Sequence, residues 1–252
     1  MFHSTKCPVD AHERHWIEDM MLWLLDQLGA RALYQSVVVL PTYDYFPDFY
    51  EGTQQCAQAV LDRVCQYMRV DPSQFELEIY SERLESSGGA PLFLGPHRTE
   101  GTAGLYATPE QADEKPIVGV EAHQLKDPPA LVATFAHEIG HFLLRDRELP
   151  PDRIHREMLT DLVPIFLGLG ILTSSAAFRF SQWHDNQYSG WRASRQGYLS
   201  EPMYGYALAV FAWLRGEKTP RWAKHLTPNV RLYLKQSVNY LRRGGETILP
   251  AR

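Results

Sequence analysis

The chain has 252 residues, of which 44% are hydrophobic, and carries a formal net charge of −5. This length and composition allow a sizeable core, in one domain or in two lobes. A mildly acidic surface attracts neither nucleic acid nor an anionic membrane, so we expect neither partner. Acidic residues interrupt the first apolar run, from Trp16 to Leu28, and no stretch reaches the roughly 18 apolar residues of a membrane span.

The cysteines indicate a reducing compartment. Cys7, Cys56 and Cys65 are odd in number and have no paired short spacing. This usage fits reduced thiols better than a framework of disulfides. Because the first residues also lack the apolar core of a secretory signal, we expect a cytoplasmic protein. No pattern in the sequence indicates an oligomeric state.

The first half of the chain combines helix and strand patterns. Residues 10–28 carry apolar side chains at intervals of three and four, which predicts an amphipathic helix that ends at Gly29. A second helix is expected over about 53–68. Strands are expected where β-branched or alternating apolar residues occur, at 37–40, 75–80, 104–107 and 117–121. These elements predict a small mixed sheet accompanied by two helices.

Two segments of this half allow more than one interpretation. The loop at 42–50 is rich in aromatic residues and proline, and it either packs its own rings or forms one wall of a substrate cleft. The strand at 117–121 directly precedes the next predicted helix, where an exposed edge would hold an extended peptide through main-chain hydrogen bonds. An interior strand fits the same pattern.

The second half is predicted to be mainly helical. Asp127, followed by two prolines, predicts the start of a helix that continues to about Leu144. Asp152 is the N-cap candidate of the next helix. Two further helices are expected at about 201–215 and 228–243. The whole pattern predicts an α+β fold in a single domain of two lobes, a mixed lobe over about 1–127 and a helical lobe over about 128–252.

The first helix of that second half contains His137-Glu138-Ile139-Gly140-His141, an H-E-x-x-H motif. Residues four apart lie on one face of a helix, so the two imidazoles can point at a common ion. Neutral imidazoles suit a divalent transition metal such as zinc, and the Glu138 carboxylate can take a proton from water bound to that metal. Such short motifs also occur by chance, but no other charge falls between Thr134 and Leu144, which favours a metal site.

A catalytic zinc needs a third protein ligand. The three-histidine version of the motif is excluded, because Leu144 and Arg147 stand where it requires glycine and histidine. Glu157 on the following helix is the better candidate, and His155, two positions away and hence on another face, is its rival. Asp161, one turn beyond Glu157, is placed to accept a hydrogen bond from a ligand histidine and fix its tautomer.

With His137-Glu138-Ile139-Gly140-His141 followed by Glu157-Met158-Leu159-Thr160-Asp161, the chain resembles the gluzincin class of zinc metallopeptidases. The resemblance covers roughly residues 117 to 172 and implies a zincin-like fold. The remainder is similar to uncharacterised bacterial proteins that carry the same motif. The resemblance implies a zinc ion held by His137, His141 and Glu157, with Glu138 as general base and Asp161 behind a ligand.

The expected reaction is hydrolysis of a peptide bond in a peptide or protein substrate, in which a second electrophile should stabilise the tetrahedral oxyanion. In the related enzymes a histidine, tyrosine or arginine from downstream has this role. We expect Tyr198 or His184 first, then Arg195 or Tyr204. The alternative is a zinc protein without catalysis, whose site stabilises the fold or recognises a partner. Glu138 favours the enzyme, because a structural site needs a fourth ligand more than a base.

Overall fold

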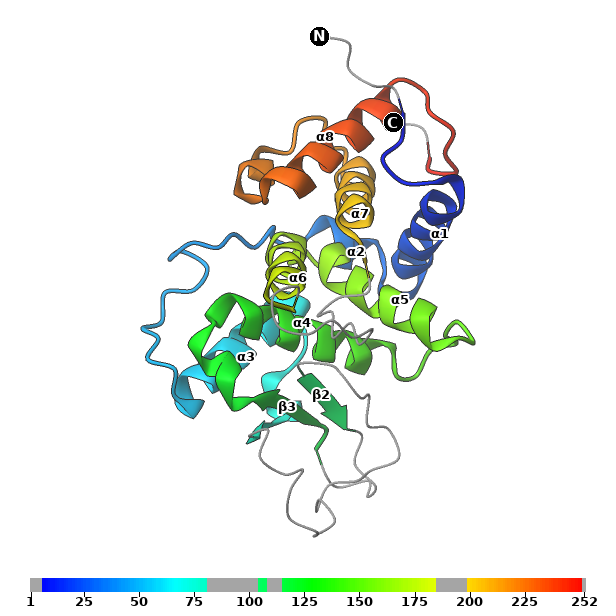
Figure 1. The fold of residues 1–252 in the computed structure, drawn as a ribbon. Helices are drawn as coiled ribbons and strands as arrows, with labels where there is room; N and C mark the ends of the chain where they lie inside the picture. The colour runs from blue at the N-terminus through cyan, green and yellow to red at the C-terminus, as the bar shows by residue number, and fades with distance from the viewer. Residues whose placement is uncertain (1–5, 81–103, 108–114, 185–198, 251–252) are drawn as a thin grey trace.

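The computed structural model describes residues 6–80, 104–107, 115–184 and 199–250, with the backbone alone for 104–107 and 178–184. Its helices are α1 (Ala11–Leu28), α2 (Ala30–Tyr34), α3 (Gln54–Met68), α4 (Pro128–Leu144), α5 (Arg153–Phe166), α6 (Gly170–His184), α7 (Glu201–Leu214) and α8 (Pro228–Arg242). The strands are β1 (Glu76–Tyr80), β2 (Gly104–Ala107) and β3 (Ile117–Glu121), and the 3-10 turns are η1 (Pro72–Gln74), η3 (Ala122–Lys126) and η4 (Arg221–His225). The fold is therefore α+β (Figure 1). Within these residues, no helix combines the length and the apolarity that a bilayer crossing requires.

Side-chain caps begin the helices at the residues that the sequence predicts. Asp10 accepts a hydrogen bond from the Glu13 amide (2.8 Å), and its own amide donates to the Glu13 carboxylate (3.1 Å), which makes a capping box at α1. Asp127 and Asp152 accept hydrogen bonds from amides three residues further on, at the starts of α4 and α5. These bonds satisfy amides that a first helical turn leaves unpaired, so both helices of the predicted metal site begin at defined positions.

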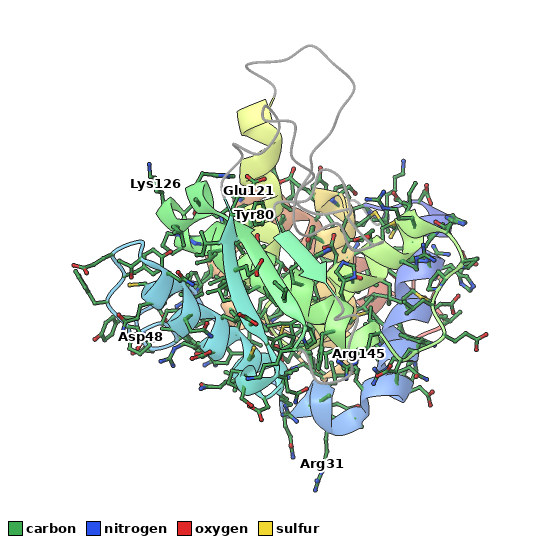
Figure 2. The ribbon with its side chains drawn as sticks, turned by 90° about the horizontal axis from the view of Figure 1, so that it is seen from below. Arg31, Asp48, Tyr80, Glu121, Lys126 and Arg145 are labelled. Atoms are coloured by element: carbon green, nitrogen blue, oxygen red, sulfur yellow. The ribbon has the colours of Figure 1, made fainter. Side chains whose placement is uncertain are left out.

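The sheet is mixed, in the order β1-β3-β2, with β1 parallel and β2 antiparallel to β3. Val118 and Val120 of β3 are fully buried. Figure 2 shows Tyr80 and Glu121 side by side at the paired ends of β1 and β3. Both sides of this strand are paired, so of the two interpretations of 117–121 the interior strand is correct and the exposed edge is not. Among the described residues, β2 is the edge strand that contacts α4.

Residues 37–40, predicted as a buried strand, belong to no strand of the described sheet. Val39 is buried and its amide donates to the Gly168 carbonyl (2.9 Å), whereas Val37 is 53% exposed. Gly168, with φ at +95°, lies so close to this segment that a Cβ there would be 2.2 Å from the Val37 carbonyl oxygen. The turn between α5 and α6, and not another strand, is the partner of this apolar run.

The aromatic loop at 42–50 packs against α3 and is hydrogen-bonded to it. Tyr45 and Phe46 pack against the ring of Tyr67 on α3, whose hydroxyl donates to the Tyr45 carbonyl (2.6 Å). Tyr43 and Phe49 remain 76% and 82% exposed. The prediction that the loop packs its own rings is therefore only partly correct, because α3 supplies the ring against which it packs.

α4 is the central helix of the fold. It contacts α3, η3 and strands β2 and β3, and also α5 and α6 (Figure 1). Phe142 near its C-terminus packs edge-on against Phe75, which precedes β1, with 4.7 Å between the ring centres. Lys126 and Arg145, the residues around its two ends, lie on opposite sides of the molecule in Figure 2. Side chains on α4 are thus supported by both the sheet and the other helices.

α1 lies with the helices of the second half of the chain. It contacts α5 and α7, and its buried residues include Ile17, Met21 and Leu24 (Figure 1). The buried apolar residues of the described chain form one cluster that extends from Val9 to Leu249. The packing therefore crosses the expected division near residue 127, because the apolar face of α1 is covered by helices from beyond it.

A buried carboxylate joins α1 to the C-terminal residues of the described chain. Glu18 is 1% exposed and accepts hydrogen bonds from the Tyr206 hydroxyl on α7 and from the Thr247 hydroxyl (2.9 Å). Its second oxygen accepts from the Ile248 amide (2.9 Å). Three donors from two distant parts of the sequence thus converge on one acidic side chain.

Candidate metal centre

Three side chains of the types that bind metal ions, from two helices, lie close together. α4 carries His137 and His141 one turn apart, and α5 carries Glu157. Glu157 Oε2 lies 3.3 Å from His137 Nε2 and 3.4 Å from His141 Nε2. The ligand atoms of the three residues all lie within 4.8 Å of one another. This group can hold a metal ion.

The two distances from Glu157 to the histidines and the burial of these atoms fit a small divalent ion. A tetrahedral ion at about 2.0–2.1 Å from each ligand separates the ligand atoms by about 3.3–3.4 Å. Within the described part of the chain, His137 Nε2 and Glu157 Oε2 are buried and have no hydrogen-bond partner of good geometry. Buried polar atoms without a partner are rare in proteins, and a bound ion is one recognised reason for them.

Asp161 on α5 orients the first histidine. Its Oδ1 lies 2.8 Å from His137 Nδ1, and its Oδ2 accepts a hydrogen bond from the Leu199 amide (3.3 Å). Because a carboxylate can only accept, His137 Nδ1 carries a proton in this contact. The Nε2 atom is then the one directed at Glu157, as a metal ligand requires.

The same contacts set the charges of the group. Burial opposes a charged His137, but the hydrogen bond to Asp161 and the nearby carboxylate of Glu157 outweigh it and raise the pKa of His137 well above its ordinary value. Burial also opposes an ionised Glu157, and the two histidines beside its carboxylate outweigh it and lower the pKa of Glu157. A cation that binds here must therefore displace a proton from His137.

Glu138 lies beside this group without belonging to it. It follows His137 on α4 and is 4% exposed. Burial raises the pKa of Glu138, the charge of Glu157 acts in the same direction, and the two histidines oppose them. A carboxyl group whose pKa is raised toward neutrality is suited to accept and return protons.

His155, the rival third ligand, points elsewhere. Its Nδ1 pairs with Asp152 Oδ2 (2.7 Å), and its ring lies 5.7 Å from that of Trp16. It is not part of the metal-ligating group. The two residues that separate it from Glu157 place it on another face of α5, as helical geometry requires.

The residues expected to stabilise an oxyanion are only partly visible. Tyr198 and Arg195 lie outside the described residues. His184 ends α6, and its side chain lies outside them too. Tyr204 on α7 is 2% exposed, and burial together with the charge of Asp161 raises the pKa of its hydroxyl.

No protein-family model matches the chain, and comparisons with curated proteins and with solved structures find no match.

Two residues of the site were not singled out in the sequence. Thr160 Oγ1 on α5 lies 3.4 Å from His141 Nδ1. Gly140 lies where α4 and α5 cross, so close that a Cβ there would be 3.0 Å from Thr160 Cγ2. The sequence could have indicated both residues, because Thr160 lies between Glu157 and Asp161 and Gly140 lies within the H-E-x-x-H motif.

Proposed function

We propose that the chain is a zinc-dependent metallopeptidase of the gluzincin type, with a zincin-like fold. The observation that carries the proposal is the position of Glu138, a buried carboxyl group with a raised pKa next to three metal-ligating side chains. A site that only stabilised the fold would need a fourth ligand more than an adjacent base. Among the described residues, the group contains three ligands and no fourth.

Zinc is the ion that this donor set favours. Two imidazole nitrogens and one carboxylate oxygen match its preferred ligands and leave a fourth position for water or substrate. When bound, zinc would polarise the scissile carbonyl and make the attacking water more acidic.

The protein's own residues supply the other steps. His137, His141 and Glu157 would hold the ion, while Asp161 keeps a proton on His137 Nδ1. Glu138 would accept a proton from the attacking water and later donate it to the leaving amine. Its raised pKa supports both steps, because it makes the carboxylate a stronger base and keeps the proton available for the return.

The sheet supports a peptide as the substrate. β3 is central, whereas β2 lies at the edge of the described sheet and contacts α4, the helix that carries Glu138. An extended peptide can bind such an edge through main-chain hydrogen bonds. We infer that substrate pairs with the β2 backbone and presents its scissile bond to the residues of α4.

The substitution Glu138→Gln tests the function most directly. It removes the base and leaves the three ligands intact, so zinc content should be unchanged and peptide hydrolysis should fall by about 10²–10⁴-fold. Metal analysis of the purified protein and mass spectrometry of a digested peptide library measure the two quantities. Glu148→Gln, at an exposed position beyond α4, is the matched control and should retain both.

Each outcome decides between the alternatives. A purified protein without stoichiometric zinc would contradict the metal site. A zinc-loaded protein that cleaves no peptide, or that cleaves equally well with Glu138→Gln, would contradict the peptidase and support a zinc protein without catalysis.

A further inference from the structure

The C-terminal helices carry a charge opposite to that of the rest of the chain. Between Glu201 and Glu246 there are eight lysines and arginines and a single acidic residue, whereas the remaining residues include 17 basic and 29 acidic ones. Seven of the eight are exposed, and in the described part of the chain none of the seven is ion-paired. They are Lys218, Arg221, Lys224, Arg231, Lys235, Arg242 and Arg243. An otherwise acidic protein therefore has one strongly basic surface.

This surface borders a hollow between α7 and α8. The hollow measures about 230 Å³, and Lys218 and Arg242 both line it. Apolar side chains from the two helices form much of its wall, namely Ala209, Ala212, Trp213, Val238 and Leu241. Pockets that enclose a small-molecule ligand usually measure about 300–1,000 Å³. This smaller hollow is suited to a single apolar side chain of a larger partner.

The charge at the hollow is positive. Glu217 also lines it, but its carboxylate accepts hydrogen bonds from Arg215 Nε (2.6 Å) and Trp222 Nε1 (2.7 Å), so its charge is already matched. The C-terminal turns of α7 and α8 lie beside the hollow, and each such helix end counts as about half a negative charge. The full charges of Lys218 and Arg242 exceed that contribution.

The basic surface continues from the hollow along α8. Arg231, Lys235 and Arg242 are separated by four and seven residues, so they lie on one face of the helix. Figure 1 shows α7 and α8 on the opposite side of α4 from strands β2 and β3. The surface is therefore separate from the β2 edge, to which the peptide substrate is assigned.

We propose that the hollow between α7 and α8 binds an acidic segment of a partner protein, which inserts one apolar side chain beside Lys218 and Arg242. Charge complementarity selects such a segment, because its carboxylates pair with the exposed cations. A short segment contacts this surface alone, whereas a nucleic acid would extend over the acidic remainder of the protein and be repelled by it. The interaction requires neither a metal ion nor catalysis, so it goes beyond the proposed peptidase.

Synthetic peptides added to the whole chain test both features of the segment. The probe is a fluorescein-labelled peptide of glutamates with one central leucine, and fluorescence anisotropy at physiological ionic strength measures its affinity. Exchange of the leucine for alanine should weaken binding by about tenfold, because burial of the leucine side chain favours the complex. A peptide of lysines with the same leucine should not bind.

Reversal of the two cations at the hollow tests where the peptide binds. Lys218→Glu combined with Arg242→Glu should weaken binding of the glutamate–leucine peptide by about tenfold or more, since two attractive contacts become repulsive. The matched control combines Arg69→Glu and Lys126→Glu, at exposed positions after α3 and in η3, and changes the net charge equally. Its affinity should stay within about twofold of wild type, because solvent and salt screen distant charges. Thermal unfolding establishes that each variant is folded.

Several results would overturn the proposal. Wild type could bind the leucine and alanine peptides equally, or the reversed variant could bind as wild type does. A labelled oligothymidylate that binds more tightly than the peptide, and only to wild type and the control, would assign the surface to nucleic acid. Sedimentation in which wild type self-associates and the reversed variant does not would assign it to a second copy of the chain. No zinc is added, so the result stands whether or not the proposed peptidase function fails.

Discussion

The side chain of Asp161 joins two parts of the molecule through its two oxygens. One oxygen contacts His137 Nδ1 and the other accepts the Leu199 amide just ahead of α7. The carboxylate is buried, so both contacts are made in a medium that strengthens them. Asp161 therefore sets the proton position on His137 and anchors the start of another helix at the same time.

Replacement of this carboxylate tests the role of Asp161. Asp161→Asn removes the charge that favours a protonated His137, so the pKa of His137 should fall toward its ordinary value. Zinc affinity should drop by about 10- to 100-fold, because His137 loses its charged partner. The asparagine side chain also has a single acceptor oxygen, so it can accept a hydrogen bond from His137 or from the Leu199 amide but not from both in the same way. Proton NMR titration of the metal-free protein and chelator competition measure the two effects.

A second aspartate of α5 provides the control. Asp152 contacts His155 at 2.7 Å, away from the metal-ligating group, and asparagine caps a helix about as well as aspartate. Asp152→Asn should therefore leave zinc affinity unchanged. Equal affinities of Asp161→Asn and wild type would show that Asp161 does not support the ligand.

Glycines determine how closely the helices approach. A Cβ at Gly140 would meet its neighbours on α5 at 3.0 Å or more. A Cβ at Gly205 on α7 would come within 2.4 Å of Tyr233 Cβ and 2.9 Å of the Leu234 amide nitrogen on α8. The second distance involves backbone that cannot rotate away, so the contact between α7 and α8 depends on the missing side chain.

The substitution Gly205→Ala tests whether the α7–α8 contact depends on glycine. Alanine favours a helix over glycine by about 0.5–1 kcal/mol, but forcing a side chain into a packed contact costs about 1–3 kcal/mol. The clash should prevail and lower the free energy of unfolding, as measured by urea denaturation. Gly140→Ala, where the contacts are longer, should cost less. A variant Gly205→Ala as stable as wild type would contradict this account of the α7–α8 contact.

The elements that could be predicted from the sequence are those defined by interactions between residues close together in the chain. Asp10, Asp127 and Asp152 cap helices through amides three residues away, so the sequence alone contains both partners. Residues 37–40 were predicted wrongly because an apolar run does not specify its partner, which is the distant Gly168. The short helix α2 was missed because five residues have too little periodicity to be recognised.

Within the site, too, contacts along one helix could be predicted, whereas contacts between helices could not. Glu157 could be preferred to His155 because the faces of a single helix follow from sequence spacing. Thr160 could not be paired with His141 in this way, since their contact depends on the crossing of two helices at Gly140. Strand order is likewise a property of the whole sheet, which is why β3 proved to be central.

A metal ion bound to His137, His141 and Glu157 would join the central helix α4 to α5. Binding to the folded chain alone stabilises it, by about 2.7 kcal/mol when free zinc is a hundred times its dissociation constant. We expect zinc to raise the melting temperature and an added chelator to reverse the change.

The effect of pH on this stabilisation has a definite sign. The raised pKa of His137 gives the metal-free protein stability that is present below the ordinary value of 6.5 and is lost as the pH rises through the folded value. The lowered pKa of Glu157 adds stability above its ordinary value of 4.5, lost only in strong acid. Zinc requires a neutral His137, so the zinc-induced rise in melting temperature should increase between about pH 6 and about pH 8. A rise that shrinks over this range would contradict the proton displacement.

The bonds of Glu18 have a kinetic consequence for a part of the chain without regular structure. The Ile248 amide donates to a buried carboxylate that also accepts a hydrogen bond from a side chain of α7, so its proton exchanges with deuterium only while this bond is broken. We therefore expect the Ile248 amide to be protected from exchange although it lies outside any helix or strand.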